Sequence, residues 1–358
     1  MKTVSPQAVR LLAPLLLLFS VAAQSGVFDS PKPEAASASE TPAEYQRGAE
    51  QTFLTFPEWF LVYSPAEYAD YVKTHTPTRF PFLGHTRQFW QGYSTVYEAT
   101  RKDYQFNFGY HVMILVIGTS TTLEYGIRAA YEGLIGRLSE LTMTGPLTEE
   151  DRYGAEVAQD YVDFIRVRPW YEYNFTLKLT GLWRNTSFTG RDMLRKWERK
   201  YALSTEYLSK AIYGWMIKVA TGTAYDPAAE TTIVVLDGIP GNINLPLPLL
   251  KQLQQLPSKH ILVELPRYHE FMHYAAVLAQ HDVVFHEIAG NRGPVLISAL
   301  CNSAACPLPP DSKILFEQDI LTLPGSKRVV LTTPVTALAP TLKKLSANGL
   351  TPEHIYDF

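Results

Sequence analysis

The sequence predicts an α+β protein, with an aromatic-rich helical domain followed by a ferredoxin-like α+β domain. Two observations support this prediction. Residues 43–222 consist of long segments with helical periodicity and many Phe, Trp and Tyr side chains. Residues 229–358 alternate short apolar runs, which are typical of strands, with three helical segments. We place the domain boundary where the sequence pattern changes from long helical segments to short apolar runs, between residues 222 and 229.

Residues 1–23 have the anatomy of an export signal. Lys2 and Arg10 charge the first part, residues 11–21 form a short apolar run, and small residues offer a cleavage site before Gln24. The run is shorter than the ~20 residues that cross a bilayer comfortably. A cleaved signal is therefore favoured over a retained N-terminal anchor. Residues 24–42 are rich in Pro, Ser, Ala and Glu and predict a disordered tether.

The helical domain is predicted as a series of helices separated by proline and turn residues. Pro57 is expected to end the first helix and create an elbow, because proline lacks the N–H that an interior position needs. Residues 170–183 fit either a short helix or an extended segment. The other helices are predicted at 44–56, from Pro65 onward, and at 88–104, 106–141, 148–168, 191–201 and 204–219.

The stretch from Phe106 to Leu123 carries no formally charged residue, so residues 106–127 are a candidate membrane helix. Four consecutive hydroxyl residues, 119–122, interrupt the apolar character. The sequence leaves two alternatives open: a helix that crosses a membrane, or a buried helix of a water-soluble domain.

The C-terminal domain is predicted as two strand–helix–strand units with hairpins between them, which together form a mixed sheet with helices on one face. This fold hosts many unrelated functions and implies none. Its strands are expected at 231–238, 259–266, 282–289, 294–301, 313–321, 327–335 and 353–358, and its helices at 245–256, 269–280 and 336–348.

Several classes of function lack support. The net charge is −3 at pH 7, so no global basic field attracts nucleic acid. The chain has no glycine-rich dinucleotide motif, phosphate-binding loop or GxSxG elbow.

The segment 269–273, HEFMH, matches the zinc-peptidase pattern HExxH. In that pattern His269 and His273 would bind zinc, Glu270 would activate a water molecule as the catalytic base, and Glu287 is an imaginable third ligand. We favour no metal here, because helical projection places both histidines on the solvent side. The core side of the same helix is predicted to be Phe271, Ala275, Leu278 and Ala279.

The two cysteines, Cys301 and Cys306, are predicted to form a disulfide if this domain lies outside the cytoplasm. Free thiols are the second alternative and a metal site is the third, since two thiols without a second pair make a poor zinc site. Asp237 and Gly238 follow an apolar strand and are interpreted as a turn.

The tracts EQTFLTFPEWFLVYSPAEYADYV, RVRPWYEYNF, LRKWERKYALSTEY and EHIYDF resemble those of an uncharacterised family of bacterial envelope proteins. The resemblance implies a bacterial origin and an exported or inner-membrane location. That family has no assigned activity, so no catalytic residue is transferred.

Together these observations predict a non-enzymatic protein of the bacterial cell envelope. It would be exported, periplasmic or in the inner membrane, with a membrane as one partner and a protein bound by the C-terminal domain as another. No cofactor and no nucleic acid are expected. Two alternatives stay open: a zinc-dependent hydrolase that uses the 269–273 motif, and a protein that binds a lipid or other apolar ligand.

Overall fold

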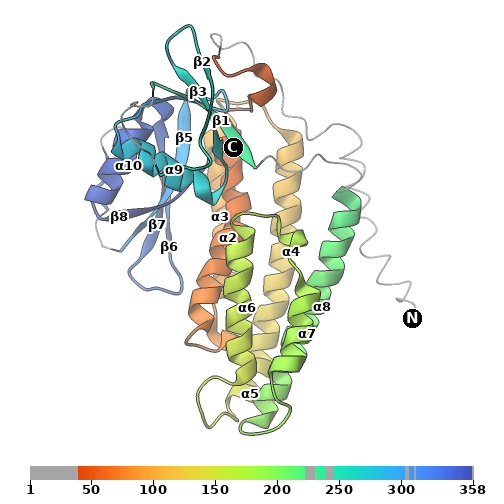
Figure 1. Cartoon of the computed structure of the whole chain (residues 1–358). Coiled ribbons are helices and arrows are strands. Elements are labelled where there is room, and N and C mark those ends of the chain that lie inside the picture. The colour runs from red at the N-terminus through yellow and green to blue at the C-terminus, as the bar shows by residue number, and fades with distance from the viewer. Residues whose placement is uncertain (1–38, 222–229, 239–245, 303–305, 310–311, 357–358) are drawn as a thin grey trace.

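The computed structural model describes residues 39–221, 230–238, 246–302, 306–309 and 312–356 (Figure 1). The α+β prediction is confirmed, since helices come first and two four-stranded antiparallel sheets follow. The predicted export signal and almost all of the predicted tether lie outside the described residues.

The helical region forms an elongated bundle beside the sheets (Figure 1). The predicted start of one helix at Thr148 is confirmed, because its side chain and Asp151 form a capping box. The helices are α2 (Gln51–Val72), α3 (Phe82–Thr100), α4 (Phe108–Tyr131), a π-helical turn (Glu132–Gly136), α5 (Arg137–Glu140), α6 (Glu149–Ile165), α7 (Phe175–Asn185) and α8 (Met193–Thr221), with single 3₁₀ turns at Ala43–Tyr45, Pro77–Arg79 and Trp170–Glu172.

Helix α2 is continuous through Pro57 and Pro65, so the predicted elbow at Pro57 is wrong. An interior proline costs a helix about 3 kcal/mol. On the same helix Phe56 and Phe60 are almost completely buried, and burying a large apolar side chain contributes about 1.5–3 kcal/mol. Several such side chains together outweigh the cost of the prolines.

Of the two alternatives left open for residues 106–127, the helix that crosses a membrane is the one that the structure contradicts. Among the described residues, none of the helices combines the length and the apolar character that a bilayer span requires. Helix α4 instead lies along α3, with Gly118 so close to the rings of Phe89 and Trp90 that an added Cβ would overlap them. The hydroxyl residues 119–122 and the charges that follow keep its apolar run short.

The C-terminal strands divide between two sheets of identical topology. Sheet A contains β1 (Thr231–Leu236), β2 (Lys251–Gln255), β3 (Ile261–Pro266) and β4 (Phe285–Ile288) in the order β2-β3-β1-β4, with α9 (His269–Gln280) between β3 and β4. Sheet B contains β5 (Pro294–Cys301), β6 (Lys313–Asp319), β7 (Lys327–Pro334) and β8 (Leu350–Tyr356) in the order β6-β7-β5-β8, with α10 (Leu338–Ala347) between β7 and β8.

Two details of the predicted sheet differ from the structure. The strands form two antiparallel sheets where a single mixed sheet was expected. Residues 245–256 were predicted as a helix, but β2 is an exposed edge strand paired with β3. Pro246 and Pro248 prevent a helix from forming ahead of this strand, and the Lys and Gln side chains of β2 suit a solvated sheet edge.

Sheet B lies between two hydrophobic cores. Alternate residues of a strand point to opposite faces, so Ile297 packs under α9 and α10 while Leu296 faces α2. On the α2 side, Tyr356 and Val330 join a cluster with Phe56. The helical region and the sheets therefore share one apolar interface.

Polar contacts tie α2 to the same sheet. The Oγ1 of Thr52 donates a hydrogen bond to the Tyr356 carbonyl at 2.7 Å and accepts one from the Leu296 N–H at 2.9 Å. The Tyr63 hydroxyl lies 2.8 Å from the Ser298 hydroxyl and 2.7 Å from the Tyr356 hydroxyl. These contacts fix the position of α2 along the strands.

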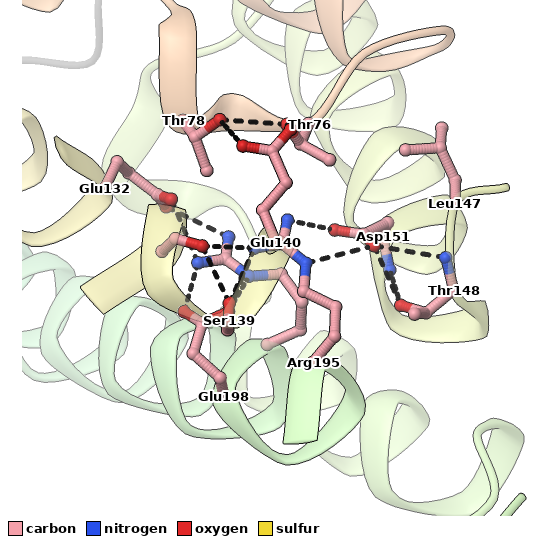
Figure 2. A network of polar contacts seen from close by, with 12 residues as sticks. Thr76, Thr78, Glu132, Ser139, Glu140, Leu147, Thr148, Asp151, Arg195 and Glu198 are labelled. Atoms are coloured by element: carbon pink, nitrogen blue, oxygen red, sulfur yellow. Dashed lines mark hydrogen bonds and ion pairs between the residues drawn. The ribbon is translucent and has the colours of Figure 1, made fainter. Parts of the chain in front are cut away.

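A buried ion network joins α8 to α4, α5 and α6 (Figure 2). Arg195 Nη2 lies 2.8 Å from Asp151 Oδ1, and Arg195 Nη1 lies 3.1 Å from Glu198 Oε2. Arg199 Nη1 lies 2.9 Å from Glu132 Oε1, a carboxylate that belongs to the π-helical turn. Each cation thus has a carboxylate partner away from solvent, as buried charges require.

A second buried group sits where α2 meets sheet B, and it predicts a pH effect. Burial raises the pKa of Glu67 to about 7, although Arg328 Nη1 lies 3.2 Å from its carboxylate and lowers that pKa. The nearby charges of Glu353 and Asp70 raise it further. Burial, with Arg328, lowers the pKa of His85 to about 3. Below about pH 7 the folded protein therefore favours the protonated form of Glu67, whereas an ordinary glutamate loses its proton near pH 4.5.

Because the pKa of Glu67 is higher in the folded protein than its ordinary value of 4.5, protonation of Glu67 stabilises the fold. This contribution to the unfolding free energy is complete below pH 4.5 and is lost as pH rises through about 7. We expect Glu67→Gln, which mimics the protonated acid, to reduce the loss of unfolding free energy between about pH 5 and pH 8 by about 1–3 kcal/mol. His85, whose pKa is lower in the folded protein than its ordinary value of 6.5, adds an opposite trend below about pH 6.5, and this trend is common to wild type and variant. Urea denaturation at each pH measures the effect, and parallel pH profiles for wild type and variant would contradict it.

Candidate metal centre

Three potential metal ligands converge at one end of sheet A, on three adjacent strands. Asp237 directly follows β1, His260 directly precedes β3, and His286 is the second residue of β4. The antiparallel register places Leu236 of the central strand opposite Ile261 on one side and Phe285 on the other. The residues next to these pairs are therefore brought to the same edge of the sheet.

The donor atoms of these residues are close together. Asp237 Oδ1 lies 3.2 Å from His286 Nε2 and 3.7 Å from His260 Nε2. One donor atom from each residue fits within 4.8 Å of the others, and the two imidazole rings stack with centroids 4.0 Å apart. The Asp237 side chain is 56% exposed while both histidines are half-buried. The group is thus open to solvent on the aspartate side.

Glu40 approaches His260 from the opposite side of the ring. Its two carboxylate oxygens each lie 3.1 Å from His260 Nδ1, and Ser258 donates a hydrogen bond to one of them at 2.7 Å. The Ser258 hydrogen bond, together with His260, holds the pKa of Glu40 below its usual value. Because a carboxylate accepts from Nδ1, the neutral His260 ring presents the lone pair of Nε2 toward Asp237.

Glu287 holds the Glu40 segment in place. Its buried carboxylate accepts hydrogen bonds from the Ser39 hydroxyl at 2.7 Å, the Glu40 N–H at 2.9 Å, and the Thr41 N–H and hydroxyl at 2.9 Å and 2.7 Å, and it is paired with Arg292. Burial raises the pKa of Glu287, but these hydrogen bonds outweigh it and keep the pKa below its usual value. Glu287 therefore acts as an anchor for residues 39–41.

Glu287 is not available as a third metal ligand for the 269–273 motif. His269, Glu270 and His273 lie on the exposed side of α9, and the buried side is the one predicted from the sequence. The Glu287 carboxylate is occupied by residues 39–41 and Arg292. Within the described residues, Asp237, His260 and His286 are the one group of three that could hold a metal ion.

Comparison with family models, with curated proteins and with solved structures finds no match. The resemblance to bacterial envelope proteins therefore stays a prediction, and only the geometry of the group bears on function.

From the sequence, Asp237 is interpreted as a turn residue, and neither His260 nor His286 belongs to a motif. Asp237 lies at a bend and Gly238 has a φ of 105°, which glycine adopts readily. The residues that would complete the turn lie outside the described ranges. The three ligands are far apart in sequence and have no helical spacing that would reveal them. Asp237 and His260 lie next to the ends of predicted strands, but His286 lies in the middle of one.

Cys301 and Cys306, the pair that the sequence offers as a disulfide, are bonded to each other in the structure. The bond closes the segment that follows β5, with Cα atoms 6.1 Å apart. It leaves neither thiol available as a metal ligand.

Proposed function

We propose that the protein binds a divalent transition metal, with Zn²⁺ as the expected ion, through Asp237, His260 and His286. The observation that carries the proposal is the arrangement around His260. One of its ring nitrogens faces the Glu40 carboxylate and the other faces Asp237. A metal-bound histidine typically has this environment, with a carboxylate on the nitrogen that does not bind the metal.

The distances suit a zinc ion. Two donors bound to zinc at 2.0–2.1 Å with tetrahedral geometry lie about 3.3 Å apart. The Asp237 oxygen is 3.2 Å and 3.7 Å from the two Nε2 atoms, close to this separation. The two stacked rings would turn relative to each other to direct both Nε2 lone pairs at one ion. Although Asp237 is 3.2 Å away, His286 Nε2 forms no hydrogen bond with it or with another described residue, and a metal would supply the missing interaction.

Bound metal would connect β1, β3 and β4 directly and residues 39–41 through Glu40. We propose that the metal stabilises and positions this edge of the sheet for a partner, the role expected of the non-enzymatic protein predicted from the sequence. Three protein ligands leave a fourth position for water or for a group from the partner.

Metal analysis of the purified chain tests the proposal. We expect about one zinc ion per chain by elemental analysis after equilibration with ZnCl₂ and desalting, and loss of that zinc in His286→Ala and in Asp237→Asn. His273→Ala is the matched control, because it removes an exposed histidine of the 269–273 motif and should leave zinc unchanged. If His273→Ala loses zinc and His286→Ala retains it, the metal belongs to the motif on α9 and the proposal fails.

Glu40→Gln tests the role of the outer carboxylate. The variant should retain the full zinc stoichiometry but bind zinc about 10–100-fold more weakly, as measured by competition with a coloured chelator. Zinc at about 100 times its Kd should raise the unfolding free energy of wild type by about 2.7 kcal/mol and leave that of His286→Ala unchanged. A protonated His260 that donates to both Glu40 and Asp237 is the alternative to a metal. In that case zinc would not compete with the chelator for the protein and would not change the unfolding free energy.

A further inference from the structure

The end of the helical bundle farthest from the sheets, at the bottom of Figure 1, has an unusual surface. Here α5, the loop 141–148 and the first turn of α8 meet, and we call this region the basal end. Ser139 of α5 donates a hydrogen bond to Glu198 of α8 at 2.8 Å, so the two elements are in contact. The basal end combines a patch of exposed apolar side chains with a hollow lined by cations.

The apolar patch begins in the π-helical turn. Leu134 is 67% exposed and Leu141 is 82% exposed, with Ile135 and Leu138 between them. Leu194 and Trp197 at the start of α8 are also exposed. A water-soluble protein rarely leaves this many large apolar side chains together in solvent, and such patches mark binding surfaces.

The hollow has a volume of about 610 Å³, and its lining includes Glu140 of α5 and Met143 of the loop that follows. Its charged lining consists of one carboxylate and a larger number of basic side chains. The carboxylate, Glu140, accepts hydrogen bonds from the Thr76 hydroxyl at 2.7 Å and the Thr78 hydroxyl at 2.6 Å. The basic residues that line it are Lys73, His75, Arg79 and Arg152.

Charges of both signs surround the hollow. Arg191 donates hydrogen bonds to Thr144 and contacts Gly145, a residue of the hollow. Lys73 is paired with Asp70, 2.6 Å away, and Asp192 accepts from the Thr144 N–H at 2.7 Å. The hollow and its surroundings therefore keep a small excess of basic over acidic side chains, although the whole chain has a net charge of −3.

We propose that the basal end docks on the surface of a lipid bilayer that contains anionic phospholipid. Leu134, Leu138 and Leu141 would enter the boundary between headgroups and acyl chains, and the cationic hollow would receive a phosphate-bearing headgroup. Apolar side chains beside basic residues are the combination that binds proteins to the surface of anionic membranes. The docking needs no membrane-spanning helix and does not depend on the metal centre.

The charge pattern also disfavours a second copy of the chain as the occupant. In a symmetric dimer the same patch faces itself, so the two cationic hollows would approach each other. An anionic bilayer instead complements both parts of the surface.

Co-sedimentation of the purified chain with vesicles tests the proposal. Vesicles of phosphatidylcholine with phosphatidylglycerol are expected to bind the chain at least tenfold more tightly than phosphatidylcholine vesicles, given about fivefold for each basic residue near the surface. The triple change Leu134→Ser, Leu138→Ser and Leu141→Ser should abolish sedimentation with both. Arg79→Glu combined with Arg152→Glu should reduce binding to the anionic vesicles alone.

Leu249→Ser is the matched control, because Leu249 is an exposed leucine near sheet A that should not contact lipid. All variants alter exposed residues, and their melting temperatures confirm folding. The proposal is overturned if wild type fails to sediment with anionic vesicles, or if Leu249→Ser binds as weakly as the triple variant. A dimer dispersed by the triple change, without vesicle binding, would assign the patch to a second copy, and inorganic phosphate bound without vesicle binding would assign the hollow to free phosphate.

Discussion

Arg195→Ala is expected to lower the unfolding free energy by about 3–5 kcal/mol, the range seen when one partner of a buried charge pair is removed. The Arg195 side chain is fully buried. Its guanidinium donates to Asp151, to Glu198, to the Ser139 hydroxyl at 3.1 Å and to the Gly136 carbonyl at 3.2 Å (Figure 2). Alanine would leave the Asp151 carboxylate away from water without its cation, and Glu198 would keep Arg199 alone.

Chemical denaturation followed by helical circular dichroism measures this loss. Arg101→Ala is the control, because Arg101 forms an exposed ion pair with Glu98 at 2.6 Å, and exposed pairs contribute only about 0–1 kcal/mol. Equal effects of the two substitutions would show that Asp151 and Glu198 find other partners, and the network would then not hold α8 against α5 and α6.

Phe56→Ala is expected to cost about 3–5 kcal/mol, as the removal of a buried phenylalanine usually does. Phe56 lies where α2 meets sheet B and is 1% exposed. Its ring centroid is 4.9 Å from that of Phe316 in an edge-to-face contact and 5.8 Å from that of Tyr356. Gly92 of α3 closes the site from the other side. The cavity would therefore open between the helical region and the sheet.

Because Phe56 is shared by both regions, its loss should lower the stability of both together. Helical circular dichroism and exchange of the sheet B amides should report the same decrease. Phe108→Ala, at an exposed phenylalanine of α4, is the size-matched control and should change stability by less than about 0.5 kcal/mol. A loss confined to the helical signal would show that sheet B is stable without the interface.

Local patterns predicted much of the secondary structure. The capping box at Thr148 and the buried side of α9 follow from spacing alone, and the structure confirms both. Predictions failed where tertiary packing opposed a local rule. Pro57 remains inside a helix because the buried rings around it outweigh its cost, and β2 is a strand because an edge of sheet A is available to it.

The candidate metal centre could not be predicted from the sequence, for a different reason. Its ligands come together only when three strands pair in a particular register. The spacing of the three residues along the sequence does not indicate that pairing. The HExxH motif had the opposite property, with helical spacing evident in sequence but no third ligand among the described residues. Motif matching thus identified the histidines that a helix brings together and missed the histidines that a sheet brings together.

The identical topology of sheets A and B has a consequence for assembly. Residues 231–288 and 294–356 form successive βββαβ units, and α9 of the first packs against α10 of the second in one shared core. Neither unit could bury its helix alone. The short link that joins them at Gly290 keeps complementary partners within one molecule, and the same complementarity would allow two chains to exchange units if that link were opened.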